Sequence, residues 1–192
     1  MPCDAKFPKG SPVRATKVEM LGERVFKLLN NLFASITLFI ILKQDDCDFM
    51  DVRVGGNTSV PYYFVNYPCQ KLPKYLDEFY LFKLSYHFFE LAFTTLKQSD
   101  RPDFPEYFFH HFMTWSLIFF SYSLNMMPVG AAVMILHDVS DLSVTLFKLT
   151  IDWTSIYLQS FTYGSMLVVW MYLRLWYFPG YVIKRIYEEC YE

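Results

Sequence analysis

The chain has 192 residues, of which 54% are hydrophobic and 20% are aromatic. Its net charge of -2 and pI of about 6.1 argue against nucleic acid as the main partner, because nucleic acid favours a basic surface. The apolar residues gather into runs of roughly 20, the length with which an α-helix crosses a bilayer, which argues against an ordinary water-soluble domain.

Five membrane-spanning helices are predicted after a polar arm at residues 1–24. The arm has three prolines and no apolar core, so we expect it to be irregular and amphipathic, and not a signal peptide. The predicted spans are Val25–Leu42, Phe79–Leu96, Glu106–Leu124, Val129–Thr150 and Ile156–Phe178. Pro179-Gly180 is expected to end the last span, and residues 181–192 form a charged tail. The fold class is therefore an all-α, polytopic transmembrane bundle over residues 25–180.

Two connections in this bundle are short. Pro105 can occupy the first turn of the third span, where a missing backbone N–H is tolerated. Asn125 and Pro128 mark a tight turn between the third and fourth spans. We therefore expect these two helices to be antiparallel neighbours whose polar faces can meet.

Ionisable side chains inside these two spans are the main chemical feature of the sequence. The third span has His110 and His111 near its start, and the fourth has His137, Asp138 and Asp141 near its middle. Residues three or four apart share a face of a helix, so one face of the fourth span offers a histidine and carboxylates. Such groups are costly at membrane depth and normally face the bundle interior or a water-filled cavity.

Three interpretations of this set remain open. The groups can satisfy one another between helices in a purely structural role. His137 and Asp141 have a spacing that a metal ion could use, but four histidines and no CxxC pair are few ligands for a metal centre. Alternatively, a carboxylate orients a histidine that accepts a proton or carries an acyl group. In the second span, His87 and Glu90 are three residues apart and can form a local pair.

Polar positions recur at fixed spacing through the third and fourth spans. They read His110-His111-x-x-Thr114, Ser121-Tyr122-x-x-Asn125, Gly130 and Leu136-His137-Asp138-x-Ser140-Asp141. This order and spacing resemble the Lag1 motif of ceramide synthases, in the TLC (TRAM–LAG1–CLN8) superfamily. The resemblance covers roughly residues 19–187.

The resemblance implies N-acylation of a sphingoid base by a fatty acyl-CoA, which is a co-substrate, with no cofactor and no metal ion. The catalytic set that it implies is His110, His111, His137, Asp138 and Asp141. The substrate-binding set is Ser121, Tyr122, Asn125 and Lys148.

The sequence also departs from the family pattern. Pro128 stands where the family usually has arginine, and Thr145 where it has glutamate. The chain has neither the first nor the last span of ceramide synthases, so we expect a TLC-like fold shortened at both ends and lacking the last family helix.

Two functions follow, and whether the chain is an enzyme stays open between them. The departures favour a structural, lipid-contacting accessory subunit of a multi-subunit membrane complex, with membrane lipids and other membrane subunits as its partners. The alternative is an active sphingosine N-acyltransferase that makes ceramide. We expect an integral membrane location, in the mitochondrial inner membrane or the endoplasmic reticulum.

Overall fold

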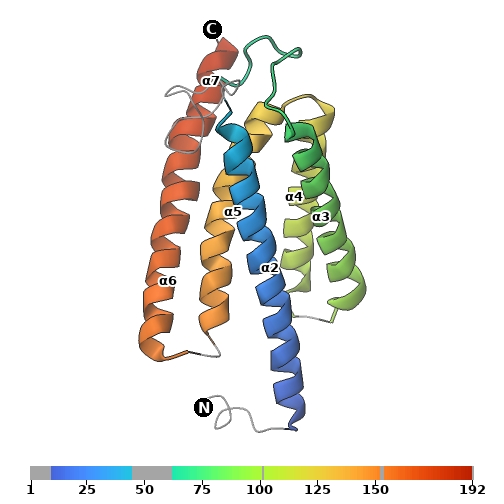
Figure 1. Cartoon of the computed structure of the whole chain (residues 1–192), viewed down its shortest axis with the longest axis vertical. Coiled ribbons are helices and arrows are strands. Elements are labelled where there is room, and N and C mark those ends of the chain that lie inside the picture. The colour runs from blue at the N-terminus through green and yellow to red at the C-terminus, as the bar shows by residue number, and fades with distance from the viewer. Residues whose placement is uncertain (1–9, 45–61, 101, 152–153, 192) are drawn as a thin grey trace. The chain divides into compact units, whose positions relative to one another are not determined.

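A computed structural model describes residues 10–44, 62–100, 102–151 and 154–191, and all regular structure in these ranges is helical (Figure 1). This confirms the predicted all-α class. The helices are α2 (Pro12–Leu42), α3 (Leu76–Lys97), α4 (Phe104–Ser123), α5 (Met127–Thr150), α6 (Ile156–Trp170), the π-helix η1 (Met171–Ile183) and α7 (Lys184–Tyr191).

Helix α2 begins at Pro12 and not at Val25, so the expectation of an irregular arm is wrong for residues 12–24. Ser11 caps this helix: the backbone N–H of Arg14 donates to Ser11 Oγ at 3.2 Å and to the Ser11 carbonyl at 3.0 Å. A serine cap followed by proline at the first helical position is a strong start signal. Residues 1–9 of the predicted arm lie outside the described part of the chain.

The sequence predicted that the last helix ends at Pro179-Gly180, and the structure contradicts this prediction. The helix continues as η1 through both residues and joins α7 directly. The backbone N–H of Lys184 donates to the carbonyl of Pro179, five residues back, which is the π-helical pattern. Proline disrupts a regular α-helix because its ring displaces the preceding turn, and a change of winding accommodates it.

Three of the described helices are long and apolar enough to cross a membrane: Pro12–Leu42, Met127–Thr150 and Ile156–Tyr191. Helices α3 and α4 occupy the predicted second and third spans and have 22 and 20 residues. At 1.5 Å per residue, each is about 30 Å long, which matches a bilayer core.

The chain divides into two compact units. One comprises residues 1–37 and 135–184, and the other comprises residues 38–134 and 185–192. Helices α3 and α4 lie wholly in the second unit, whereas α6 and η1 lie wholly in the first.

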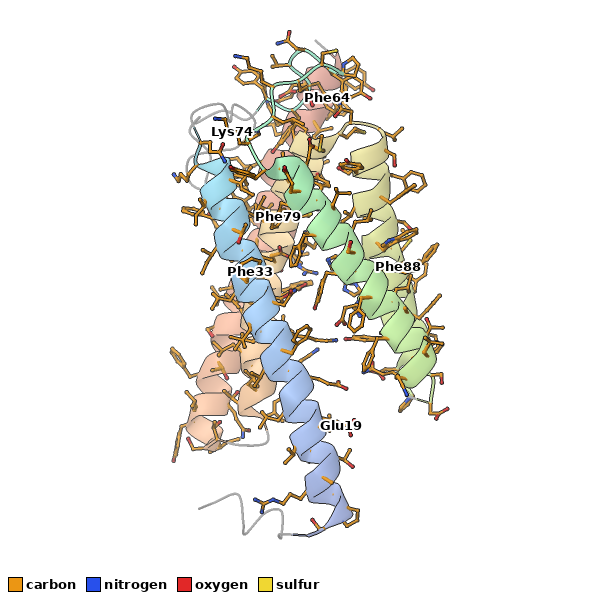
Figure 2. The ribbon with its side chains drawn as sticks, turned by 45° about the vertical axis from the view of Figure 1, so that its right-hand side comes forward. Glu19, Phe33, Phe64, Lys74, Phe79 and Phe88 are labelled. Atoms are coloured by element: carbon orange, nitrogen blue, oxygen red, sulfur yellow. The ribbon has the colours of Figure 1, made fainter. Side chains whose placement is uncertain are left out.

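Helices α3 and α4 lie side by side and run antiparallel (Figure 1). Phe88 of α3, which is labelled in Figure 2, packs against Trp115 of α4, and their ring centroids are 6.1 Å apart. Nearer the other end of the pair, Tyr80 packs against Tyr122, with ring centroids 6.0 Å apart. Later residues of α3 thus pair with earlier residues of α4, as in any antiparallel pair. These two contacts define the register between the helices.

The turn between α4 and α5 is tight, as predicted. The Met126 N–H donates to the Ser121 carbonyl at 2.7 Å, and Asn125 takes a left-handed backbone conformation with φ of 55°. Tyr80 fixes this turn from α3, because its hydroxyl donates to the Met127 carbonyl at 2.8 Å. Gly130 allows that approach, since a Cβ there would overlap the Tyr80 and Ser121 hydroxyl oxygens.

Candidate functional site

A row of polar side chains lies on one face of α3. We call it the α3 polar row, and its members are Tyr80, Lys83, His87, Glu90 and Thr94. Their spacings of three and four residues keep them within about 80° on the helix circumference. Lys83 and Glu90 are 1% and 3% exposed, although charged side chains are almost never fully buried without compensation. The row therefore makes the interior face of α3 polar.

His111 of α4 faces this row. Its Nε2 lies 4.0 Å from Glu90 Oε2, and both side chains are buried. The Tyr107 ring, one turn earlier on α4, meets the His111 imidazole edge-on with centroids 4.5 Å apart. The His111 imidazole thus lies between a carboxylate and an aromatic ring in a water-poor interior.

The two adjacent histidines have different surroundings. His111 is buried, whereas His110 is exposed, and their ring centroids are 5.5 Å apart. Successive residues of an α-helix point about 100° apart, so both rings cannot face α3. His111 is therefore the member of the predicted pair that the protein interior positions.

His137, Asp138 and Asp141 form the second predicted set, on α5 in the other compact unit. Asp138 is buried, and the half-buried His137 ring meets Phe178 of η1 with centroids 5.9 Å apart. Arg174 of η1 forms an ion pair with the Asp141 carboxylate. Asp141 therefore has a cationic partner that the sequence did not suggest.

Ser140 completes these contacts and lies fully buried between the two aspartates in sequence. Arg174 Nε donates to Ser140 Oγ at 2.8 Å, and the same hydroxyl donates to the His137 carbonyl at 2.9 Å. The Arg174 guanidinium also lies over the Trp170 ring, 5.9 Å from its centroid. These contacts fix the first turns of η1 against the middle of α5.

Three predicted substrate-binding residues contribute to the turn after α4. The Ser121 hydroxyl donates to the Met126 carbonyl at 2.9 Å and lies 3.1 Å from the Tyr80 hydroxyl oxygen. The Tyr122 ring packs on Tyr80, and the Asn125 side-chain amide donates to the Pro68 carbonyl. Their described contacts therefore hold the turn and the preceding loop, and a role in substrate binding stays a prediction.

The fourth predicted substrate-binding residue, Lys148, has an exposed side chain near the end of α5. Its backbone carbonyl accepts a hydrogen bond from Arg24 Nη1 of α2 at 2.7 Å. Both departures from the family pattern have local structural roles. Pro128 is fully buried in the first turn of α5, and the Thr145 hydroxyl donates to the Asp141 carbonyl at 2.8 Å.

The structure thus places some of the predicted site residues in contact with one another, but it does not bring the whole predicted set together. The paired histidines belong to one compact unit and the His137 set to the other, so the predicted meeting of the two sets stays a prediction. Within the described ranges, no three histidine, cysteine or acidic side chains converge in a way that could hold a metal ion.

The sequence interpretation missed Lys83 and the cross-helix role of Glu90, which it paired with His87. The signal was present as polar residues at spacings of three and four within an otherwise apolar span. It did not identify the partner, because only the register between α3 and α4 brings Glu90 opposite His111.

Comparison with known proteins adds an independent finding. Residues 21–192 match the family model described as the TLC domain. Bovine (Bos taurus) ceramide synthase 4 is 36% identical over 126 residues, which cover 65% of this chain and 31% of the bovine protein. ASC1-like protein 3 of rice (Oryza sativa subsp. japonica) is 26% identical over 172 residues, which cover 90% of this chain and 57% of the rice protein.

Human (Homo sapiens) ceramide synthase 5 is 34% identical over 127 residues, which cover 66% of this chain and 32% of the human protein. The matched region thus spans less than two thirds of the length of each of these relatives. The similarity extends well beyond the histidine and aspartate positions.

Proposed function

The chain belongs to the TLC domain family of integral membrane proteins, and from that premise we propose that it transfers a fatty acyl group from a thioester to the nitrogen of a long-chain amine. The proposed substrates are a fatty acyl-CoA and a sphingoid base, and the product is a ceramide. The names of the similar proteins support this reaction class. The observation that carries the proposal is the buried contact between His111 and Glu90, with 4.0 Å between Nε2 and Oε2.

The chemistry requires a base in a water-poor interior. A long-chain amine is mostly protonated near neutral pH, and its lone pair must be freed before it can attack a thioester. In the proposed reaction, His111 takes one proton from the ammonium group. The amine nitrogen then attacks the thioester carbonyl carbon, a C–N bond forms and the C–S bond breaks. The thiolate leaves with one proton, and the second proton reaches water.

The family resemblance also assigns His137, Asp138 and Asp141 to the same reaction. The buried Asp138 is next to His137 in sequence, and buried carboxylates commonly orient imidazoles or stabilise imidazolium. The Arg174–Asp141 ion pair gives this part of α5 a fixed local arrangement.

A direct test is ceramide formation by the purified chain in lipid nanodiscs, with a fatty acyl-CoA and a sphingoid base as substrates. We expect His111→Ala to reduce turnover by about 100-fold or more, as for loss of a general base. Phe112→Ala is a matched control, because Phe112 is the next residue of α4 and is exposed. Absence of ceramide from a folded wild-type chain would refute the proposal.

A second candidate function is a structural, lipid-contacting subunit of a larger membrane complex. The observation that favours it is Arg174, which binds Asp141 and Ser140 and so uses a predicted catalytic carboxylate to join two helices. Only 11% of the most apolar stretch of Ile156–Tyr191 is buried within the chain, which leaves a long surface for lipid or another subunit.

Purification in mild detergent distinguishes the two candidates. A fixed set of membrane subunits at constant stoichiometry, together with no acyl transfer, would support the structural role. A tagged chain in intact cells would also test the two proposed locations, the mitochondrial inner membrane and the endoplasmic reticulum.

A further inference from the structure

We propose that Glu90 is a positioning residue for His111, and that its carboxylate fixes one tautomer of the imidazole and stabilises the imidazolium formed during acyl transfer. The inference rests on the proposed acyltransferase function and assigns a role to a residue outside the predicted catalytic set. Its starting point is the contact between α3 and α4 that joins Glu90 Oε2 to His111 Nε2.

The contact between Glu90 and His111 is buried, which strengthens the interaction between the two side chains. Side-chain exposure is 10% for His111 and 4% for Glu90. A carboxylate in such surroundings loses most of its hydration and interacts more strongly with nearby charge than it would in water. At 4.0 Å the two atoms are close but not hydrogen-bonded, and a small side-chain rotation or one bridging water would make the hydrogen bond.

The geometry also selects the nitrogen that works as the base. Nε2 is the imidazole nitrogen directed at Glu90, so a proton on Nε2 is the one that the carboxylate stabilises. Nδ1 then keeps its lone pair for the proton of the substrate ammonium. Because Nδ1 is buried in this conformation, the His111 side chain must turn before that transfer. The imidazolium that forms keeps its Nε2–H toward Glu90, and the proton on Nδ1 is the one released later.

The α3 polar row also contains a basic side chain. Lys83 is two helical turns from Glu90 on the same face, about 10.5 Å along the axis, and is equally buried. His87 lies between them, three residues before Glu90. A basic and an acidic side chain therefore lie on the same buried face of α3.

The test is a series of substitutions at Glu90 in the full chain in nanodiscs. Glu90→Gln keeps an oxygen acceptor but removes the charge, and Glu90→Met removes both at similar length. We expect kcat to fall by about 10-fold in Glu90→Gln and by about 100-fold in Glu90→Met, with KM for both substrates unchanged. Glu90→Asp should recover part of the loss. Glu78→Gln and Glu78→Met are the matched controls, because Glu78 is exposed on the same helix.

A second readout does not depend on turnover. The ¹⁵N chemical shifts of His111 distinguish the two neutral tautomers, and we expect the Nε2–H form in the wild type. Glu90→Gln should keep that tautomer, whereas Glu90→Met should give a mixture. A purely structural Glu90 would alter thermal stability while leaving the tautomer and the ratio of kcat to KM unchanged.

The kinetic measurements and the ¹⁵N chemical shifts together distinguish a failure of the acyltransferase function from a failure of the role of Glu90. Wild-type chain that forms no ceramide but shows the Glu90-dependent tautomer would overturn the acyltransferase function and keep the contact. Active wild-type chain in which Glu90→Met matches Glu78→Met in kcat, or in which His111 carries its proton on Nδ1, would overturn the role of Glu90. Circular dichroism of each variant checks that helical content is unchanged.

Discussion

Asp141 of α5 and Arg174 of η1 form an ion pair within one compact unit, and Arg174 Nε also donates to the neighbouring Ser140 hydroxyl at 2.8 Å. The sequence left both a structural and a chemical role open for Asp141, and the structure gives it a partner, Arg174, that the sequence did not indicate. The two roles predict different behaviour of the two residues on substitution.

Asp141→Asn should destabilise the chain by about 1 kcal/mol, since the Asp141 side chain retains 42% exposure and the ion pair is partly solvated. Arg174→Gln should have a similar effect. The double variant should cost less than the sum of the two, because the second substitution removes an interaction already lost. Thermal unfolding in detergent micelles measures all three. Equal loss of acyl transfer in both single variants would indicate a structural role, whereas selective loss in Asp141→Asn would indicate chemistry.

Gly130→Ala should destabilise the turn between α4 and α5. The added Cβ overlaps the Tyr80 and Ser121 hydroxyl oxygens, so Tyr80 must move and its hydrogen bond to the Met127 carbonyl weakens. Overpacking of this kind costs about 1–3 kcal/mol. The measurement is the midpoint of thermal unfolding.

Gly164→Ala is the matched control for that substitution. Gly164 lies within α6, and a Cβ there would meet nothing within 4 Å. Alanine favours a helix by about 1 kcal/mol over glycine, so this variant should be neutral or more stable. Equal melting temperatures for the two variants would contradict the steric explanation.

Much of the fold could be predicted because apolar runs and helix signals are local. The helices α3, α4 and α5 begin and end within a few residues of the predicted spans. Pro105 lies in the first turn of α4, and the tight turn forms at Asn125, as expected. Each of these features depends on neighbouring residues in the chain, which makes it readable from sequence.

The remaining features depend on context that the sequence alone does not display. Pro179 and Gly180 normally end a helix, but the change to π winding lets this helix continue. Glu90 meets His111 because of the register between two packed helices. Arg174 lies 33 residues after Asp141, and no local pattern connects them. Such contacts follow from tertiary packing and not from spacing.

Glu189→Gln should release the loop at residues 62–67. Glu189 Oε2 accepts hydrogen bonds from the backbone N–H groups of Tyr63 at 2.8 Å and Phe64 at 2.9 Å, and Arg185 Nε lies 3.1 Å from Oε1. Hydrogen bonds to a charged group contribute about 1.5–3 kcal/mol, so loss of the charge should increase exchange of these two amides by about 10-fold or more. Hydrogen–deuterium exchange with mass spectrometry reports it.

Glu188→Gln is the control for the loop, since it removes the same charge from the preceding residue of α7. The Glu188 side chain is 42% exposed, and its described contact is to Arg185 at 3.5 Å. It should leave the exchange of Tyr63 and Phe64 unchanged. Equal exchange in the two variants would show that the net charge of α7, and not the bonds of Glu189, holds the loop.

Ser11→Ala should fray the first turns of α2. The Ser11 hydroxyl accepts a hydrogen bond from the Arg14 N–H, and loss of such a cap costs about 1 kcal/mol of helix stability. Amide exchange at Arg14 and Ala15 should therefore rise by about fivefold, while exchange near Phe33, in the middle of the apolar stretch, stays the same. Thr16→Val is the control, because the exposed Thr16 hydroxyl donates only to the Pro12 carbonyl within the helix. Unchanged exchange in Ser11→Ala would mean that Pro12 alone is sufficient to start the helix.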